Sequence, residues 1–307
     1  MENQCLGLAE ALRLEPVVKR ISLHSPWRQL SPWLRLGKRF AIDPNGDEIG
    51  PPWPDLLIAS GRLSVLPALS VRERSRKRTF TIQIQDPVIG RRHFDLVVVP
   101  DHDRLRGANV VVTRGALHRV TAAKLAEATA RLGHLYNHLP RPRIAVLIGG
   151  DNGIYRMTPT IMGDLAERLN HLARAHGAGL MITPSRRTGA DNEAILRARM
   201  RDVPSVVWNG EGENPYFAFL GLAEAIVVTC DSVSMVSEAC STGKPVYLVP
   251  LEGGSPKFRL FHDRLGRDGI VRPFNGSLQS WNYPPLDDTN NVAVEVARRL
   301  AERGPAR

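Results

Sequence analysis

Short runs of apolar and β-branched residues alternate with longer stretches whose apolar positions recur every three or four residues. Runs that are apolar throughout are typical of strands covered on both faces, and the longer stretches have the period of amphipathic helices. This alternation predicts an α/β protein built on parallel sheets. The predicted strands cover residues 55–59, 79–85, 94–99 and 110–113, followed by 143–148, 179–183, 206–209, 225–229 and 246–249.

The segment Pro140-Arg141-Pro142 is short and rigid, and it separates two such series of strands. We therefore expect two Rossmann-like domains facing across a cleft. The chain opens with a helical pattern from Cys5 to Leu14, whereas a domain of this class normally opens with a strand and a glycine-rich turn, so we expect the first strand to be missing. The expected divisions are an N-terminal, acceptor-side domain at 1–120, a connecting helix and proline linker at 121–142, a C-terminal domain at 143–290, and a terminal helix at 291–307 that packs back on the first domain.

The stretch 225–249 predicts a strand, a turn, a helix and a second strand, which is a parallel βαβ unit. Asp231 and Ser232 are helix-start residues, and the free N–H groups of a helix start favour anions. Ser234 and Glu238 are four residues apart and share a face of that helix. This pattern suits a sugar nucleotide, with its diphosphate on the N–H groups and its ribose hydroxyls on Glu238. The alternative is that both serines are only caps and Glu238 is a solvated surface residue.

Two further turns of the second half follow predicted strands. Gly149 and Gly150 form a turn where the backbone can approach a phosphate closely. Ser185, Arg186 and Arg187 follow the next strand, and paired arginines can hold a diphosphate through bidentate hydrogen bonds. The alternative is a solvated basic loop, which is common in so basic a protein.

Four polar turns follow the strands of the first half, at 60–62, 85–87, 101–103 and 114–118. Because the carboxyl ends of parallel strands meet at one edge of a sheet, these turns define one side of a cleft. Asp86 and His118 are the candidate general bases, and Gln85 and Arg114 could hold an acceptor. Asp101 and Asp103 have the spacing of a metal-binding pair, but we interpret them as a strand-exit loop. The nine histidines show no helical pair with zinc-binding spacing.

Charge and cysteine content narrow the function classes. The chain has 41 Lys and Arg against 31 Asp and Glu, a net charge of +10, which favours acidic partners such as phosphates or anionic lipid. Nucleic acid is the weakest of these partners, because the charge is scattered and no nucleic-acid-binding motif is present. Three cysteines without metal-ligand spacing predict a reduced, cytoplasmic compartment. No run of 18 apolar residues is present, so we expect no membrane-spanning helix.

Residues 22–40 combine aromatic, leucine and basic side chains with two prolines. One interpretation of this composition is a surface that rests on an anionic bilayer, on the inner face of the membrane, with aromatics inserted and cations at the headgroups. The alternative is a helix and loop that pack their apolar residues on the sheet. The residues concerned are Trp27, Arg28, Trp33, Arg35, Lys38, Arg39 and Phe40.

Several stretches together resemble the mitochondrial fission ELM-type family of bacteria and plants, within the superfamily of glycosyltransferases of GT-B fold. The GT-B likeness rests on the serine-rich turn, the glutamate on the following helix, and the G-x-P strand start at 243–245. The family likeness extends over nearly the whole chain. Its strings are ENQCLGLAEAL (2–12), QIQDP (83–87), TRGALHRV (113–120), LIGGD (147–151), SRRTG (185–189), GENPY (212–216), DSVSMVSEA (231–239) and LEGGSPKF (251–258).

The resemblance implies a glycosyltransferase-like protein that binds a nucleotide-diphosphate sugar in its C-terminal domain, without a metal or other cofactor. It implies that Glu213 and Asn214 lie beside the nucleotide base, and that Lys257 contacts the donor's sugar and phosphates. The acceptor could be lipid-linked. Two alternatives stay open: a non-catalytic adaptor of GT-B fold at a membrane surface, and a nucleotide-sugar 2-epimerase, which needs acid and base carboxylates in the cleft.

Overall fold

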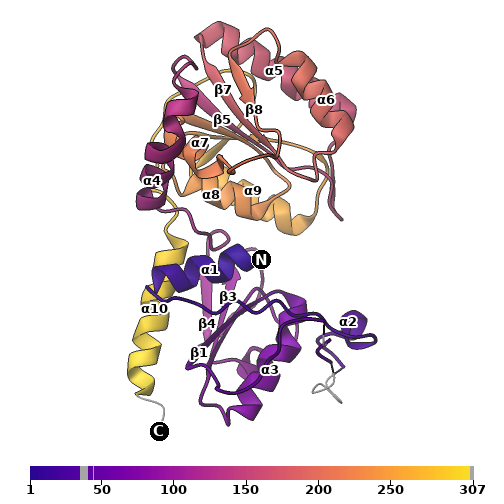
Figure 1. Ribbon diagram of the computed structural model, residues 1–307, viewed down its shortest axis with the longest axis vertical. Coiled ribbons are helices and arrows are strands. Elements are labelled where there is room, and N and C mark those ends of the chain that lie inside the picture. The colour runs from indigo at the N-terminus through magenta and orange to yellow at the C-terminus, as the bar shows by residue number, and fades with distance from the viewer. Residues whose placement is uncertain (35–40, 44, 305–307) are drawn as a thin grey trace. The chain divides into compact units, whose positions relative to one another are not determined.

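The computed structural model describes residues 1–34, 41–43 and 45–304, and the chain forms two compact units (Figure 1). Unit 1 comprises Met1–Arg119 and Asp287–Arg307, and unit 2 comprises Val120–Leu286. Each unit has its own parallel sheet with helices packed on it. The predicted α/β class with parallel sheets is therefore confirmed.

Unit 1 is a four-stranded parallel sheet in sequence order, β1 (Leu56–Ser60), β2 (Phe80–Ile84), β3 (Leu96–Pro100) and β4 (Val110–Thr113). Alternate strand residues face opposite ways, so Leu96 packs in one core cluster and Val97 in another. Helices α1 (Glu2–Ala11) and α10 (Asp288–Arg303) supply Leu8 and Val292 to the first cluster. Helix α3 (Val65–Arg74) covers the other face, and α2 (Trp27–Leu30) is a single short turn.

Unit 2 is a six-stranded parallel sheet in the order β12-β10-β9-β5-β7-β8. Its strands are β5 (Arg143–Ile148), β7 (Gly179–Pro184), β8 (Ser205–Val207), β9 (Ala225–Thr229), β10 (Val246–Val249) and β12 (Val271–Pro273). Its helices are α4 (Ala122–Leu132), α5 (Pro159–His176), α6 (Ala190–Arg199), α7 (Tyr216–Leu222), α8 (Val233–Cys240) and α9 (Pro256–Arg267). The strand order reverses between β5 and β9, so their carboxyl ends form a topological switch point, where sheets of this type bind ligands.

Four helices of unit 2 begin at a residue whose side chain caps the first turn. Thr121, Thr158, Ser232 and Ser255 are the N-caps of α4, α5, α8 and α9, and each side-chain oxygen accepts a backbone N–H of its first turn. Helix α5 ends at Gly177, whose φ of 61° is the left-handed geometry that glycine adopts at low cost.

A short antiparallel ribbon joins two loops at the carboxyl edge of this sheet. Strand β6 (Tyr155–Arg156) comes from the loop after β5, and β11 (Glu252–Gly253) comes from the loop after β10. A Cβ at Gly253 would lie 2.2 Å from the carbonyl oxygen of Ile154, so only glycine allows this pairing. Since β9 lies between β5 and β10 in the sheet, the ribbon connects the loops on either side of the β9 exit.

The predicted element boundaries differ from the observed ones where tertiary contacts set them. The terminal helix was expected from residue 291 but begins at Asp288, whose carboxylate accepts hydrogen bonds of 2.9 Å from the backbone N–H groups of Arg114 and Gly115. The first helix covers Glu2–Ala11 rather than residues 5–14, and β8 covers Ser205–Val207 rather than residues 206–209.

We expect Gly7→Ala to lower the free energy of unfolding by about 1–3 kcal/mol, because the new Cβ would overpack α1 against the chain. That atom would lie 2.2 Å from the carbonyl oxygen of His118, which is backbone and cannot swing aside. Gly163→Ala is the matched control, since Gly163 lies within α5 with open space around it. Gly163→Ala should raise the free energy of unfolding by up to about 1 kcal/mol, because alanine has a higher helix propensity than glycine. Calorimetric unfolding that shows stabilisation by both substitutions would contradict this packing of α1.

Candidate functional site

The switch point of unit 2 is organised around the carboxylate of Asp231, whose side chain has 0% of its surface exposed. The hydroxyl of Thr229 donates to Oδ1 at 2.6 Å, and the N–H of Gly150 donates to Oδ2 at 3.2 Å. The Arg187 guanidinium forms an ion pair with Oδ2 at 2.8 Å. These groups come from the exits of three adjacent strands, β5, β7 and β9, so this one carboxylate ties the turns together.

The glycine pair after β5 permits this arrangement. A Cβ at Gly149 would lie 2.2 Å from both carboxylate oxygens of Asp231, and a Cβ at Gly150 would lie 2.0 Å from the carbonyl oxygen of Arg187. The close approach seen at these glycines is therefore to the chain's own carboxylate and backbone. The hydroxyl of Thr188 adds a hydrogen bond of 2.6 Å to the carbonyl of Gly149.

The two arginines after β7 have different environments. Arg187 is engaged with Asp231 and also donates to the carbonyl of Gly150 at 3.4 Å. Both side chains are exposed to solvent, and they differ in that Arg187 has this ion pair. Ser185 stabilises the turn that carries both arginines, because its Oγ accepts a hydrogen bond from the N–H of Arg187 at 3.2 Å. Among the described residues of the switch point, Arg187 forms an ion pair with Asp231, and Arg186 does not.

Helix α8 begins directly after Asp231. The hydroxyl of Ser232 caps it by accepting from the N–H of Met235 at 3.3 Å, as its sequence predicted. The N–H groups of Val233 and Ser234 open the helix and have no acceptor within it. The half-buried Ser234 lies one turn before Glu238 on the same helix.

Glu238 is half-buried rather than a solvated surface residue. The hydroxyl of Tyr216, the first residue of α7, donates to its Oε2 at 2.5 Å. Burial raises the pKa of Glu238 to about 7, while the hydrogen bond from Tyr216 acts in the opposite direction. Burial likewise raises the pKa of Tyr216 well above its usual value, so the phenol stays a donor. Glu238 thus changes charge close to neutral pH.

The segment 212–216 is fixed by local contacts. Glu213 forms an ion pair with Arg131 of α4. The side chain of Asn214 accepts from the N–H of Tyr216 at 3.0 Å, which sets the start of α7. Both Glu213 and Asn214 are exposed, and Lys257 is exposed in the first turn of α9.

Thr229, Tyr216 and Tyr155 are contributors that the sequence did not single out. Tyr155 of the ribbon hydrogen-bonds the buried thiol of Cys230, and its ring packs edge-on against Phe258 at 5.3 Å between centroids. Thr229 was assigned only to a strand, and Tyr216 was visible only as the last letter of GENPY. Their partners are distant in sequence or lie in a turn of unpredictable geometry, so no local spacing identifies them.

The two candidate bases lie in unit 1, at different strand exits. Asp86 is half-buried after β2, and its Oδ1 accepts from the N–H of Val88 at 2.8 Å. His118 is only 4% exposed. Its backbone N–H donates to the hydroxyl of Thr289 of α10 at 3.1 Å, and α1 packs on its carbonyl group through Gly7. Asp86 is therefore the more accessible of the two.

The acidic pair after β3 has internal roles. Asp101 forms an ion pair with Arg106 at 2.6 Å, and Asp103 is buried. Within residues 1–34, 41–43 and 45–304, no three His, Cys, Asp or Glu side chains are grouped so that they could hold a metal ion.

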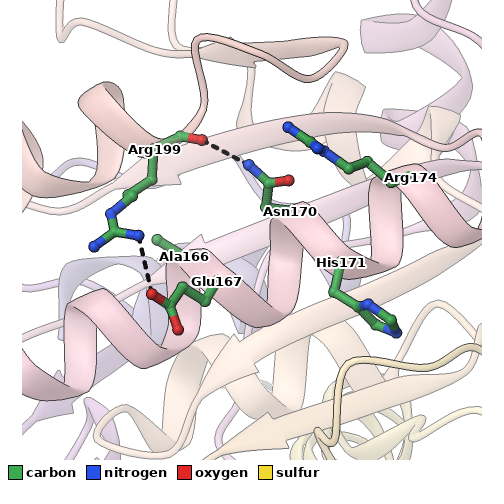
Figure 2. A pocket seen from close by; sticks show the side chains of 6 residues that line it. All are labelled: Ala166, Glu167, Asn170, His171, Arg174 and Arg199. Carbon is green, nitrogen blue, oxygen red and sulfur yellow. Dashed lines mark hydrogen bonds and ion pairs between the residues drawn. The ribbon is translucent and has the colours of Figure 1, made fainter.

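A surface groove of about 380 Å³ lies between α5 and α6 (Figure 2). Arg199 pairs with Glu167 at 2.9 Å, and the side-chain amide of Asn170 donates to the carbonyl of Arg199 at 3.0 Å. His171 and Arg174 complete the basic lining. The groove follows the middle and carboxyl-terminal part of α5, which runs away from the carboxyl edge of the sheet. None of the predicted site residues lines it.

The fold is shared with a sugar-nucleotide enzyme. The UDP-GlcNAc 2-epimerase of Methanocaldococcus jannaschii, in complex with UDP-GlcNAc and UDP, aligns with a TM-score of 0.52 over 81% of this chain and 76% of that chain. The sequence identity is 11%, so the likeness concerns the fold, which is GT-B-like as predicted.

Sequence relatives identify the family. "Mitochondrial fission protein ELM1" of Arabidopsis thaliana is 35% identical over 278 residues, which is 82% of this chain and 65% of the plant protein. The chain therefore spans slightly less than two thirds of that relative's length. "Uncharacterized protein RP120" of Rickettsia prowazekii (strain Madrid E) is 27% identical over 280 residues, with 78% of each chain covered. The family profile described as mitochondrial fission ELM1 matches residues 1–300. The resemblance noted from the sequence is thus confirmed, and the chain belongs to the mitochondrial fission ELM1 family.

Proposed function

We propose that this protein is a GT-B-type glycosyltransferase-like enzyme whose unit 2 binds a nucleotide-diphosphate sugar at the start of α8. The proposal depends on the carboxyl group of Glu238. It lies on α8, a helix that is capped by a serine and begins at the switch point of the sheet, and it accepts a hydrogen bond from the hydroxyl of Tyr216. A half-buried acid that has no cationic partner among the described residues, and whose pKa is raised by burial, is costly to keep as a structural element alone, which favours a binding role.

The diphosphate would bind at the helix start rather than in the glycine turn. The N–H of Gly150 and the guanidinium of Arg187 already serve the carboxylate of Asp231. The N–H groups of Val233 and Ser234 are oriented by the helix and carry its positive dipole end. Arg186 and Lys257 are exposed cations that would add to this attraction.

The ribose would bind at Glu238, one turn farther along α8. A carboxylate has two oxygens, and Tyr216 uses Oε2. In this proposal Oε1 accepts hydrogen bonds from the ribose hydroxyls. Glu213 and Asn214 lie just before Tyr216 and would border the base.

The proposed reaction is transfer of the sugar to an acceptor hydroxyl. A general base removes the acceptor's proton, and the cations and the α8 start stabilise the departing diphosphate. Asp86 is favoured over His118 as the base because its carboxylate is more accessible. An epimerase activity would instead release a rearranged sugar without an acceptor, and a non-catalytic adaptor would bind the nucleotide sugar without turning it over. Product analysis of a donor incubated with and without candidate acceptors distinguishes the three.

We expect UDP-GlcNAc, or another sugar carried on UDP, GDP, ADP or CMP, to bind with an affinity that depends on Glu238. Glu238→Gln removes the charge and should weaken binding about tenfold at pH 8, since a hydrogen bond to a charged group contributes about 1.5–3 kcal/mol. Burial raises the pKa of Glu238 to about 7, so the wild-type affinity should fall about fivefold between pH 8 and pH 6, as the carboxylate is converted into a neutral form that binds about tenfold more weakly. Glu238→Gln should abolish this dependence.

Isothermal titration calorimetry measures both effects. A diphosphate joined to a sugar does not itself titrate in this range, so the ligand does not contribute to the pH dependence. Glu167→Gln on α5 is the control and should bind as the wild type does. If no nucleotide sugar binds at millimolar concentration, the proposed function is wrong; if Glu238→Gln binds equally well, the role given to Glu238 is wrong.

Donor binding and any turnover should survive chelation by EDTA, because cationic side chains and the helix start would neutralise the diphosphate without a metal ion. The measurement is the same titration, repeated with EDTA and then with added Mg²⁺ or Mn²⁺. Loss of binding on chelation that either ion restores would instead support a metal role for Asp101 and Asp103.

We further propose that the segment 22–40 of unit 1 contacts an anionic bilayer, through which a lipid-linked acceptor would be reached. Trp33 is 62% exposed and Leu30 is 48% exposed, while Trp27 is half-buried. Arg62 holds this segment by donating to the carbonyl groups of Gln29, Ser31 and Arg28. The predicted contributors Arg35, Lys38, Arg39 and Phe40 lie outside the described residues. None of the helices in the described ranges has the length and apolarity needed to cross a bilayer.

We expect the protein to co-sediment with phosphatidylserine-containing vesicles and not with phosphatidylcholine vesicles. Each cation near an anionic surface contributes about 1 kcal/mol, so reversing the charge at Arg35, Lys38 and Arg39 should release the protein. Added salt should do the same, because the Debye length is already about 8 Å at physiological ionic strength. Trp33→Ser should also weaken binding, whereas Leu135→Ser, at a comparably exposed apolar position of unit 2, should not. Equal binding to both vesicle types would contradict an anionic contact.

A further inference from the structure

Tyr216 connects the segment 212–216 to Glu238 through a single hydrogen bond of 2.5 Å. The tyrosine is the first residue of α7, and its position is set by Asn214, whose side chain accepts from the Tyr216 N–H at 3.0 Å. The ring also packs against Phe217, with centroids 5.9 Å apart. The hydroxyl therefore reaches Glu238 from a backbone that is itself held in place.

The other end of α7 is attached to Lys244, which lies in the turn between α8 and β10. The ammonium group of Lys244 donates to the carbonyl groups of Leu220 and Gly221, at 2.5 and 2.7 Å. These carbonyls belong to the last turn of α7, where a cation also interacts favourably with the helix dipole. Helix α7 is thus joined to α8 through Tyr216 and to the turn after α8 through Lys244, so both of its ends are held.

Helix α7 also packs closely against α4. A Cβ at Gly221 would lie 2.3 Å from the hydroxyl oxygen of Thr129 and 3.0 Å from the carbonyl oxygen of Leu125, so the two helices are in close contact. Tyr136 packs edge-on against Phe219 at 4.9 Å between centroids. A tyrosine on such a rigid support fixes the direction from which its hydroxyl approaches a partner.

We propose that Tyr216 is a positioning residue of the nucleotide site, which holds Oε2 of Glu238 so that Oε1 faces the ribose, and so makes ribose preferred over deoxyribose. The inference rests on the proposed nucleotide-sugar site and adds a residue and a specificity to it. Without the hydroxyl, the glutamate can rotate, and its carboxyl group loses the donor that favours the charged form. Both changes weaken the contact with the ribose hydroxyls and leave the contacts with the diphosphate intact.

The test is Tyr216→Phe, which keeps the ring and removes the hydroxyl. We expect the wild type to bind UDP-GlcNAc about tenfold more tightly than the same sugar on 2′-deoxy-UDP, and the variant to lose most of this preference. The affinity for the deoxy ligand should be nearly unchanged. The midpoint of the pH dependence of UDP-GlcNAc binding should move upward in the variant, which a purely structural role of Tyr216 would not cause. Tyr247→Phe is the control, because it also removes a hydroxyl that donates to a carbonyl group, that of Gln279, within unit 2.

A second measurement needs no ligand. In protein carrying carbon-labelled glutamate, the carboxyl resonance absent from Glu238→Gln identifies Glu238, and its titration by NMR should have a higher midpoint in Tyr216→Phe than in the wild type. An unchanged midpoint overturns the inference. An unchanged preference for ribose in a well-folded Tyr216→Phe variant also overturns it, and leaves the proposed function standing. A wild type that binds no nucleotide sugar overturns the proposed function and, with it, the ribose role of Tyr216.

Discussion

The arrangement of the carboxyl edge of unit 2 depends on one buried charge, the carboxylate of Asp231. An ionised group without solvent is very costly unless it is paired and hydrogen-bonded. Here Thr229, Gly150 and Arg187 supply those partners, and each comes from the end of a different strand. Removing one partner would leave the charge uncompensated, so the three turns must keep their mutual positions. The glycine pair follows from this constraint, since any side chain at Gly149 would collide with the carboxylate.

The two carboxyl groups at this edge have opposite chemical characters because their partners differ. Asp231 forms an ion pair with the guanidinium of Arg187 and accepts hydrogen bonds from Thr229 and Gly150. Glu238, seven residues later, has only the neutral hydroxyl of Tyr216 as its hydrogen-bond donor in the described part of the chain, and its pKa is raised to about 7. Asp231 therefore holds the turns of the site together, and Glu238 is the group whose charge can respond to a ligand.

The sequence predicted the parts of this site that depend on local chemistry. The strands at 225–229 and 246–249 and the cap at Ser232 are where the apolar runs and capping residues indicated. The sequence did not predict the partner of Arg187 or that of Glu238. Arg187 and Asp231 are 44 residues apart and meet only because β7 and β9 both flank β5, an order that no local pattern specifies. For the same reason, two adjacent arginines with equal expectations from the sequence have different environments in the fold.

The ribbon of β6 and β11 also limits how this protein can vary. Its two strands belong to loops that are about 100 residues apart in the chain, yet they pair residue by residue, Glu252 with Arg156 and Gly253 with Tyr155. An insertion or deletion in one loop shifts this register unless the other loop changes with it. The loop after β7 has no such pairing partner among the described strands. Relatives that share this ribbon should therefore preserve the lengths of the two paired loops together, and differences in loop length should accumulate elsewhere around the sheet.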